Sequence, residues 1–410
     1  DRESISLSAR TRQWGKNGKI TGFHRGCQNA PGANPAVTRS RSALIALPSS
    51  TVANSSQANP DPLGHALLAE RLAGIPATLA GMLARGPVPL SDRTLATRRF
   101  LVTGTGSSEA HARYLVMLLN LFTDRAAAYL PLSGFVEPAP GAFAGKTLVV
   151  WSQGVSPNAQ IALRRRREFS HTVLFTASTP AAALAAGKPD RAALLQGLLD
   201  EGNELVEFPL AEEYTTLIRF VGPMAGYLAA LQFAAQLPGF RAPLPTPDRL
   251  AALLAARAPR DLLDAMIRLP SAWSGGFNLV TAAPISDFSQ NLACKFMEGV
   301  YWPCPPISDF LQFAHGPFQQ MNAAPKPVIF LQGGSAAEAE MVDRSVRMLQ
   351  AVGLAAFVVK IDAPPLYSIF GYEAALNDLV FAVMRHLRIN QVDWPGKGRD
   401  DLLYGFCPDL

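Results

Sequence analysis

The stretch Val102-Thr103-Gly104-Thr105-Gly106-Ser107-Ser108-Glu109-Ala110 decides the fold class. An apolar run at residues 100–103 precedes it, and the apolar spacing of residues 107–122 predicts a helix after it. A strand followed by two glycines and two serines brings backbone N–H groups and hydroxyls to the positive end of a helix dipole, which suits a phosphate ester. The alternative is that the glycines tighten a turn and Ser107 caps the helix.

The same alternation of strand and helix repeats along the chain. Further buried strands are predicted at residues 147–151, 172–175 and 205–208, and a helix at residues 217–235. After a Pro-rich stretch at residues 238–247, a second series begins with a helical run at residues 248–269. It continues with strands at residues 278–282, 328–331 and 356–361 and helices at residues 288–300, 336–352 and 372–387. Apolar strands separated by helices indicate a parallel sheet covered on both faces, so we predict a duplicated α/β module.

A second polar loop follows the predicted strand at residues 147–151. It contains Ser152, Gln153 and Ser156. Because the carboxyl ends of parallel strands lie at one edge of a sheet, this loop and the first one are expected to face the same ligand. A plain helix start explains Ser156 beside Pro157, but it does not explain why Ser152 and Gln153 follow the strand directly.

These two loops resemble the motifs of the sugar isomerase (SIS) domain family. Its members carry Gly-x-Gly-Ser/Thr-Ser after one strand and Ser-Gln-Ser-Gly after another, both facing a sugar phosphate. The first motif matches residues 104–108 closely, and the second matches Ser152 and Gln153 but lacks the next serine. The resemblance implies two flavodoxin-like, three-layer SIS modules at residues 90–240 and 248–390. It also implies a substrate-binding set of Thr105, Gly106, Ser107, Ser108, Ser152, Gln153 and Ser156.

The second module carries the residues that resemble a catalytic motif. Lys295-Phe296-Met297-Glu298 and His315-Gly316-Pro317 resemble the Lys-x-x-Glu and His-Gly-Pro of the isomerase domain of glucosamine-6-phosphate synthase and related amino-sugar enzymes. The resemblance implies that Glu298 moves a proton between C1 and C2 of the sugar and that His315 assists ring opening. Lys295 lies one helical turn before Glu298, so its ammonium is expected to favour the ionised carboxylate. Taken singly, a glutamate such as Glu298 is more often a solvent-facing or paired carboxylate, and a histidine beside Gly-Pro is more often a turn residue.

The likeness is incomplete at the C-terminus. The family places a lysine that forms an imine near the position of Asp400, and Lys397 is the nearest candidate for that amine. The glutamine-hydrolysing domain, with its N-terminal cysteine nucleophile, has no counterpart, because Cys27 lies in a basic segment without periodic apolar spacing. Glutamine-dependent synthesis is therefore not expected.

The net charge of +5 is concentrated at one end of the chain. Residues 1–58 hold eight basic and two acidic side chains, which leaves residues 59–410 at −1. A near-neutral body argues against nucleic-acid binding. We expect residues 1–58 to be a disordered basic leader, or alternatively a targeting signal, followed by a helical segment at residues 59–89 and, after the modules, a tail at residues 391–410.

Three function classes follow from these motifs. The first is an isomerase, deaminase or deglycase for an amino-sugar or keto-amine phosphate. The second is a non-catalytic sugar-phosphate sensor. The third is a DNA-binding regulator, which would need helix-turn-helix elements that residues 1–58 lack. Four scattered cysteines indicate reduced thiols in a cytoplasmic protein. We expect no metal or other cofactor, because no histidine spacing suits a metal site. We also expect no membrane span. A homodimer is expected, since related sites take the His-Gly-Pro histidine from the neighbouring subunit.

Overall fold

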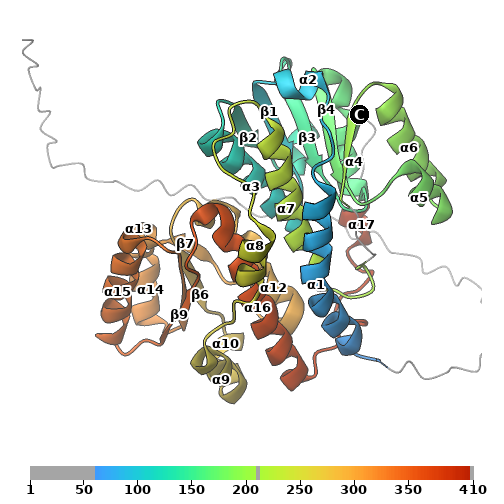
Figure 1. Cartoon of the computed structure of the whole chain (residues 1–410). Helices are drawn as coiled ribbons and strands as arrows, with labels where there is room; N and C mark the ends of the chain where they lie inside the picture. Colours follow the sequence, from blue (N-terminus) through green and yellow to red (C-terminus); the bar gives the residue numbers. More distant parts are fainter. Residues whose placement is uncertain (1–60, 209–212, 407–410) are drawn as a thin grey trace, which may run out of the picture. The chain divides into compact units, whose positions relative to one another are not determined.

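The computed structural model describes residues 61–208 and 213–406, and residues 57–410 form one compact unit. The leader predicted at residues 1–58 lies outside the described residues. Two parallel sheets organise the unit (Figure 1), so the predicted α/β class with paired parallel-sheet modules is confirmed.

The first sheet has the strand order β2-β1-β3-β4-β5, and every pairing in it is parallel. This is the flavodoxin-like order, in which the direction of winding reverses between β1 and β3. Its strands are β1 (Arg99–Thr103), β2 (Ala126–Tyr129), β3 (Thr147–Trp151), β4 (His171–Thr176) and β5 (Glu204–Glu207). Ligands of such folds bind at the carboxyl ends of the strands beside the reversal point, which here lies between the loops that follow β1 and β3.

Helices cover both faces of the first sheet because its central strands are apolar on both sides. Val102 and Val149 face the larger core, to which α1, α3 and α7 contribute, whereas Leu148 and Val150 face a smaller core under α4 and α6. The helical segments of this part are α1 (His65–Arg85), α2 (Asp92–Ala96), α3 (Ser107–Phe122), η1 (Leu132–Phe135), α4 (Pro157–Arg164), η2 (Arg166–Glu168), α5 (Pro180–Ala185), α6 (Pro189–Asp200) and α7 (Val221–Gln236).

The second sheet repeats this plan with the order β7-β6-β8-β9, again parallel throughout. Its strands are β6 (Asn278–Thr281), β7 (Ile307–Asp309), β8 (Val328–Gln332) and β9 (Ala356–Lys360). Helices α13, α14 and α15 cover one face, and α12 and α16 cover the face turned toward the first module (Figure 1). The helices are α8 (Pro247–Leu254), α9 (Arg260–Arg268), α10 (Pro270–Ser274), α11 (Ile285–Phe288), α12 (Gln290–Val300), α13 (Phe310–Phe313), α14 (Pro317–Ala323), α15 (Ala336–Gln350), α16 (Pro365–Leu387) and α17 (Asp401–Tyr404).

Several predicted element boundaries are wrong. The helical run expected at residues 248–269 is divided into α8 and α9, because Pro259 cannot continue a helix and disfavours helical geometry in the residue before it. The edge strands β2 and β7 were not predicted, since Ala-Ala-Ala-Tyr and Ile-Ser-Asp carry little strand preference. Helix α16 begins at Pro365, seven residues earlier than expected.

Helix α1 is the one described helix whose length and composition would allow it to cross a membrane, with a mean hydropathy of 1.3 in its most apolar window. The apolar helices of protein cores pass the same test. Leu68, Ile75, Leu79 and Met82 of α1 are buried in the larger core. Glu70 and Arg71 interrupt its apolar sequence. The composition of α1 by itself therefore does not indicate a membrane span.

Candidate functional site

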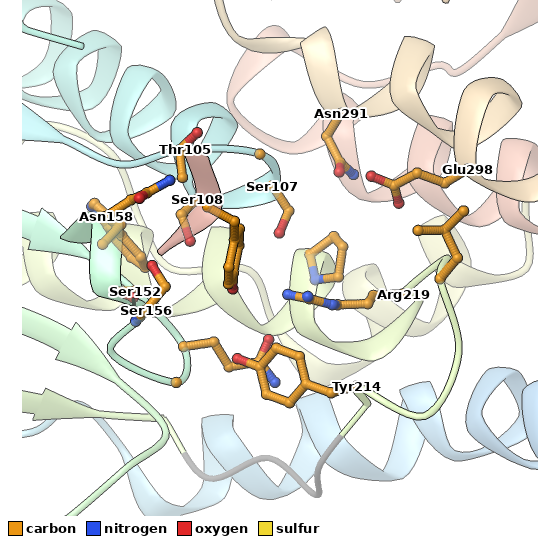
Figure 2. Close-up of a pocket in the computed structure, with 17 residues that line it drawn as sticks. Thr105, Ser107, Ser108, Ser152, Ser156, Asn158, Tyr214, Arg219, Asn291 and Glu298 are labelled. Carbon is orange, nitrogen blue, oxygen red and sulfur yellow. Dashed lines mark hydrogen bonds between the residues drawn. The ribbon is translucent and has the colours of Figure 1, made fainter. Parts of the chain in front are cut away.

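A polar cavity of about 270 Å³ lies at the carboxyl ends of β1 and β3, where the winding of the first sheet reverses (Figure 2). Its walls come from the two predicted loops, from the segment before α7, from α12 and from the C-terminal tail. The lining residues are Thr105, Gly106, Ser107, Ser108, Trp151, Ser152, Gln153, Gly154, Ser156, Asn158, Tyr214, Leu217, Arg219, Pro223, Asn291, Glu298 and Tyr404. The seven residues predicted to bind substrate are all among them.

The loop after β1 requires its glycines. A Cβ on Gly104 would lie 2.5 Å from the carbonyl oxygen of Ser108, and Gly106 has the left-handed φ of 63° that favours glycine. Ser107 and Ser108 then begin α3. No side chain in the described part of the chain caps this helix. The Glu109 N–H donates to the Gly106 carbonyl at 3.0 Å, so the N–H groups of Ser107 and Ser108 are the ones that can face an anion in the cavity, and the cap position considered for Ser107 falls to Gly106 instead.

The loop after β3 is a tight turn held by its own serines. The Ser152 hydroxyl accepts a hydrogen bond from the Ser156 N–H at 3.0 Å, and the Ser156 hydroxyl caps α4 by accepting from the Ala159 N–H at 3.4 Å. Val155 between them has a φ of 51°, which is unusual for a β-branched residue. Ser156 therefore both starts a helix, as the plain alternative proposed, and lines the cavity.

The segment before α7 forms a wall that sequence reasoning missed. Glu213 is 2% exposed and accepts hydrogen bonds from the N–H groups of Phe220, Val221 and Gly222, which fixes the start of α7. This fold-back brings Arg219 over the ring of Tyr214, at 4.3 Å from the ring centre. Figure 2 shows both side chains at the cavity. The only signal was a run of polar residues before a helix, which is not specific.

Helix α12 supplies Glu298 on the side of the cavity opposite the serine loops (Figure 2). Asn291, two helical turns earlier, lies on the same face. Burial raises the pKa of the Glu298 carboxyl, and the positive charges of Arg219 and Lys295 offset only part of that effect. The pKa of this carboxyl is thus higher than that of a surface glutamate, which suits a group that must both accept and return a proton.

Lys295 has a different partner from the one expected. Its side chain is 2% exposed, it is not among the residues that line the cavity, and its Nζ lies 2.7 Å from Oε2 of Glu373 on α16. The other oxygen of Glu373 accepts from the Asn291 amide at 2.7 Å. As expected, the charge of Lys295 favours the ionised form of Glu298 by lowering the pKa of that carboxyl, but burial outweighs this effect.

His315 and Lys397 are not among the lining residues either. His315 is exposed at the turn between α13 and α14, which cover the face of the second sheet turned away from the first module (Figure 1). The Lys397 ammonium donates to the carbonyl of Val392 at 2.6 Å and stacks on Trp394. Within one chain the structure therefore does not bring these two side chains to Glu298.

The tail closes the cavity with a different residue. Tyr404 of α17 is a lining residue, and the Asn158 amide, oriented to donate, lies 2.6 Å from its carbonyl oxygen. Upstream, Gln391 is fully buried. Its amide donates to the carbonyls of Glu298 and Gly299 and accepts from the Ile218 N–H, so it joins α12 to the segment that carries Arg219. Among the described residues, no group of three or more His, Cys, Asp or Glu side chains is placed to hold a metal ion.

Comparison with solved structures identifies the fold. No protein-family model matches the sequence, and no curated protein is significantly similar to it. The structure is similar to the C-terminal domain of glucosamine-fructose-6-phosphate aminotransferase from Francisella tularensis, with a TM-score of 0.60 and 12% identity over 82% of this chain and 100% of that one.

Two further solved structures are similar over most of their length. Tagatose-6-phosphate ketose/aldose isomerase from Escherichia coli has a TM-score of 0.55 and 13% identity over 80% of this chain and 95% of its own. Glucosamine-6-phosphate deaminase from Thermotoga maritima has a TM-score of 0.54 and 15% identity over 80% and 96%. Residues 57–410 therefore have the two-module parallel α/β fold of the sugar isomerase (SIS) proteins, the fold of phosphosugar isomerases and deaminases.

Proposed function

We propose that this protein is an enzyme that isomerises, deaminates or deglycates an amino-sugar or keto-amine phosphate by proton transfer between C1 and C2. The observation that carries the proposal is that Glu298 faces the same cavity as the two serine loops. A binding protein needs the loops alone. A proton-transfer enzyme also needs a carboxylate across from them, at the carbon end of the ligand.

In the proposed mechanism, the loops of Ser107, Ser108 and Ser152 bind the phosphate, helped by the N-terminus of α3. The open-chain sugar extends toward Glu298, whose carboxylate removes a proton from one carbon and returns it to the neighbouring carbon. A pKa raised by burial suits this cycle, because the group is then a stronger base than a surface glutamate. Arg219 stabilises negative charge that develops on the sugar oxygens.

The active enzyme is proposed to be a homodimer in which His315 comes from the neighbouring subunit. The exposure of His315, and its position outside the cavity of its own chain, support this arrangement. An imidazole supplied from the partner would donate or accept the proton needed for ring opening near neutral pH.

A non-catalytic sugar-phosphate sensor is the second candidate. It is favoured by the position of Lys397, whose ammonium is held by Val392 and Trp394 rather than at the cavity. If the Lys397 amine does not reach the cavity, the C-terminal tail supplies no nucleophile to form an imine with the sugar. The proton transfer proposed for Glu298 does not need an imine, and for this reason the enzyme is preferred.

The deciding experiment compares two cavity variants on a panel of amino-sugar and keto-amine phosphates. Glu298→Gln is expected to lower the turnover number by about 10²–10⁴ and to leave phosphate-dependent binding nearly unchanged, because only proton transfer is lost. Ser108→Ala is expected to weaken binding, while Ser274→Ala, at an exposed position of α10 outside the cavity, serves as the matched control. Aldose–ketose exchange and ammonia release are the assays, and calorimetry measures binding. Parental turnover by Glu298→Gln would refute the catalytic role, and binding without turnover by the parent would establish the sensor.

A further inference from the structure

Cys294 and Cys304 lie together at the edge of the wall that carries Glu298. Cys294 is on α12, one turn before Glu298, and Cys304 follows the C-terminus of the same helix. The amide nitrogen of Gln290 lies 3.8 Å from Sγ of Cys294 and 3.5 Å from Sγ of Cys304. Both cysteines are free thiols and partly exposed. Two thiols ten residues apart in sequence thus meet at one amide group within reach of solvent.

The two thiols differ in acidity. The hydrogen bond from Cys294 and, to a smaller extent, the Gln290 amide together lower the pKa of Cys304 to about 7, against the effects of burial and of the Glu298 charge. The same thiol pairing, together with burial, raises the pKa of Cys294. Near neutral pH, Cys304 therefore supplies a thiolate while Cys294 keeps its proton. A partly exposed thiol of low pKa next to a second cysteine is the arrangement typical of oxidation-sensitive cysteine pairs.

We propose that Cys294 and Cys304 are a modification site, a dithiol that a hydroperoxide oxidises to an intramolecular disulfide. The Cys304 thiolate attacks one peroxide oxygen, the O–O bond breaks, and the leaving oxygen takes up a proton, which leaves a sulfenic acid on Cys304. The Cys294 sulfur then attacks that sulfur, an S–S bond forms, and the S–O bond breaks as water leaves with the Cys294 proton. One hydrogen peroxide is consumed, two thiols are oxidised and two waters form.

The reactivity expected of Cys304 follows from its ionisation. At pH 7 about half of a thiol with a pKa near 7 is thiolate, compared with about one per cent for a pKa near 9. Lower basicity also makes each thiolate a weaker nucleophile, by about ten-fold over two units. The net gain at pH 7 is about five-fold over an ordinary cysteine.

The site has a structural consequence for the cavity. Cys294 lies on α12 between Asn291 and Glu298, and the intervening turn after α12 contains Tyr301 in the left-handed region with a φ of 58°. A disulfide would tie this turn to the helix by a covalent bond and would limit movement of the wall that presents Glu298.

The test measures thiols rather than catalysis, so its result does not depend on the proposed function. The full chain with Cys27→Ser and Cys407→Ser, which lie outside the described residues, retains Cys294 and Cys304 as its two thiols. With one equivalent of hydrogen peroxide at neutral pH, we expect both thiols to disappear in Ellman titration and the intact mass to fall by two hydrogen atoms. Non-reducing digestion should yield one peptide pair that joins residues 294 and 304, and dithiothreitol should restore both thiols.

Single variants assign the two roles. In Cys294→Ser, Cys304 should accumulate a sulfenic acid that dimedone traps. In Cys304→Ser, the remaining thiol of Cys294 should react with peroxide at about one fifth of the rate of Cys304, or more slowly still. Gln290→Leu, which removes the shared amide, should slow oxidation without changing the product. The proposal is overturned if the parent gives a sulfinic acid on Cys304, a disulfide between two chains, or two thiols that survive peroxide in the folded protein but not in denaturant.

Discussion

At the residue scale, Glu298 and Arg219 should be coupled through charge. Burial raises the pKa of Glu298 and Arg219 opposes that rise, so removing the guanidinium should raise the pKa further. A general base works only when deprotonated, and activity therefore falls as the pH drops through its pKa. Arg219→Met should move the acid limb of the kcat/KM profile to higher pH, with a several-fold larger loss at about pH 6 than at about pH 8.

Arg219→Lys is the matched control because it keeps a positive charge at the same wall. Its acid limb should stay close to that of the parent, even if loss of the planar guanidinium raises KM. If the acid limb of Arg219→Met coincides with that of the parent, a group other than Glu298 determines the pH dependence of kcat/KM. A uniform loss at all pH values would assign Arg219 to binding only.

At the element scale, the ion pair between Lys295 and Glu373 joins α12 to α16 in the core. Both side chains are almost fully buried, so removing one partner leaves the other charged without compensation. Lys295→Met should lower the free energy of unfolding by about 3–5 kcal/mol, measured by urea denaturation. Adding Glu373→Gln should restore most of the loss, because the new amide removes the buried charge and its oxygen still accepts from Asn291.

This double variant also separates a structural role of Lys295 from a catalytic one. If Lys295 only positions α12, the stable double variant should keep most of the turnover of the parent. A stable double variant without turnover would show that Lys295 takes part in catalysis. That result would agree with the Lys-x-x-Glu motif, although Lys295 does not line the cavity. A single variant as stable as the parent would contradict the importance of the pair.

At the scale of the whole molecule, the proposed homodimer predicts complementation between inactive chains. Glu298→Gln and His315→Ala should each lower turnover strongly when assayed alone. Mixed in equal amounts and allowed to exchange subunits, half of the dimers contain one chain of each kind. In every such dimer one of the two sites has both parental residues, so about a quarter of the parental activity should return.

Size-exclusion chromatography with light scattering measures the oligomeric state of each variant and of the mixture. A parental enzyme that is fully active as a monomer would rule out a shared site. Recovery of activity that does not depend on subunit exchange would have to come from contamination, and the freshly mixed sample is the control for it.

Much of the fold was determined by short-range pattern. The strands at residues 147–151 and 328–331 and the helix at residues 107–122 were predictable, because long apolar runs bounded by glycine, proline and serine leave few alternatives. The glycine turn after β1 was equally readable, since Gly104 and Gly106 are required by backbone contact and φ. The edge strands β2 and β7 were not, because pairing with a neighbour stabilises them rather than their own side chains.

The sequence by itself determined which residue types follow the strands, and hence the two serine loops, whereas Glu298 was singled out by the resemblance of its Lys-x-x-Glu motif. Only the tertiary structure decided which charges meet. Lys295 pairs with Glu373, 78 positions away in sequence, and Arg219 reaches the cavity because Glu213 folds the chain back before α7. The position of His315 outside its own cavity was decided in the same way. The physical reason is that helical spacing specifies which side chains share a face of one helix, whereas the partner that packs against that face comes from a distant segment. The burial that results sets the pKa of a group such as Glu298 as strongly as a charged neighbour within the motif does.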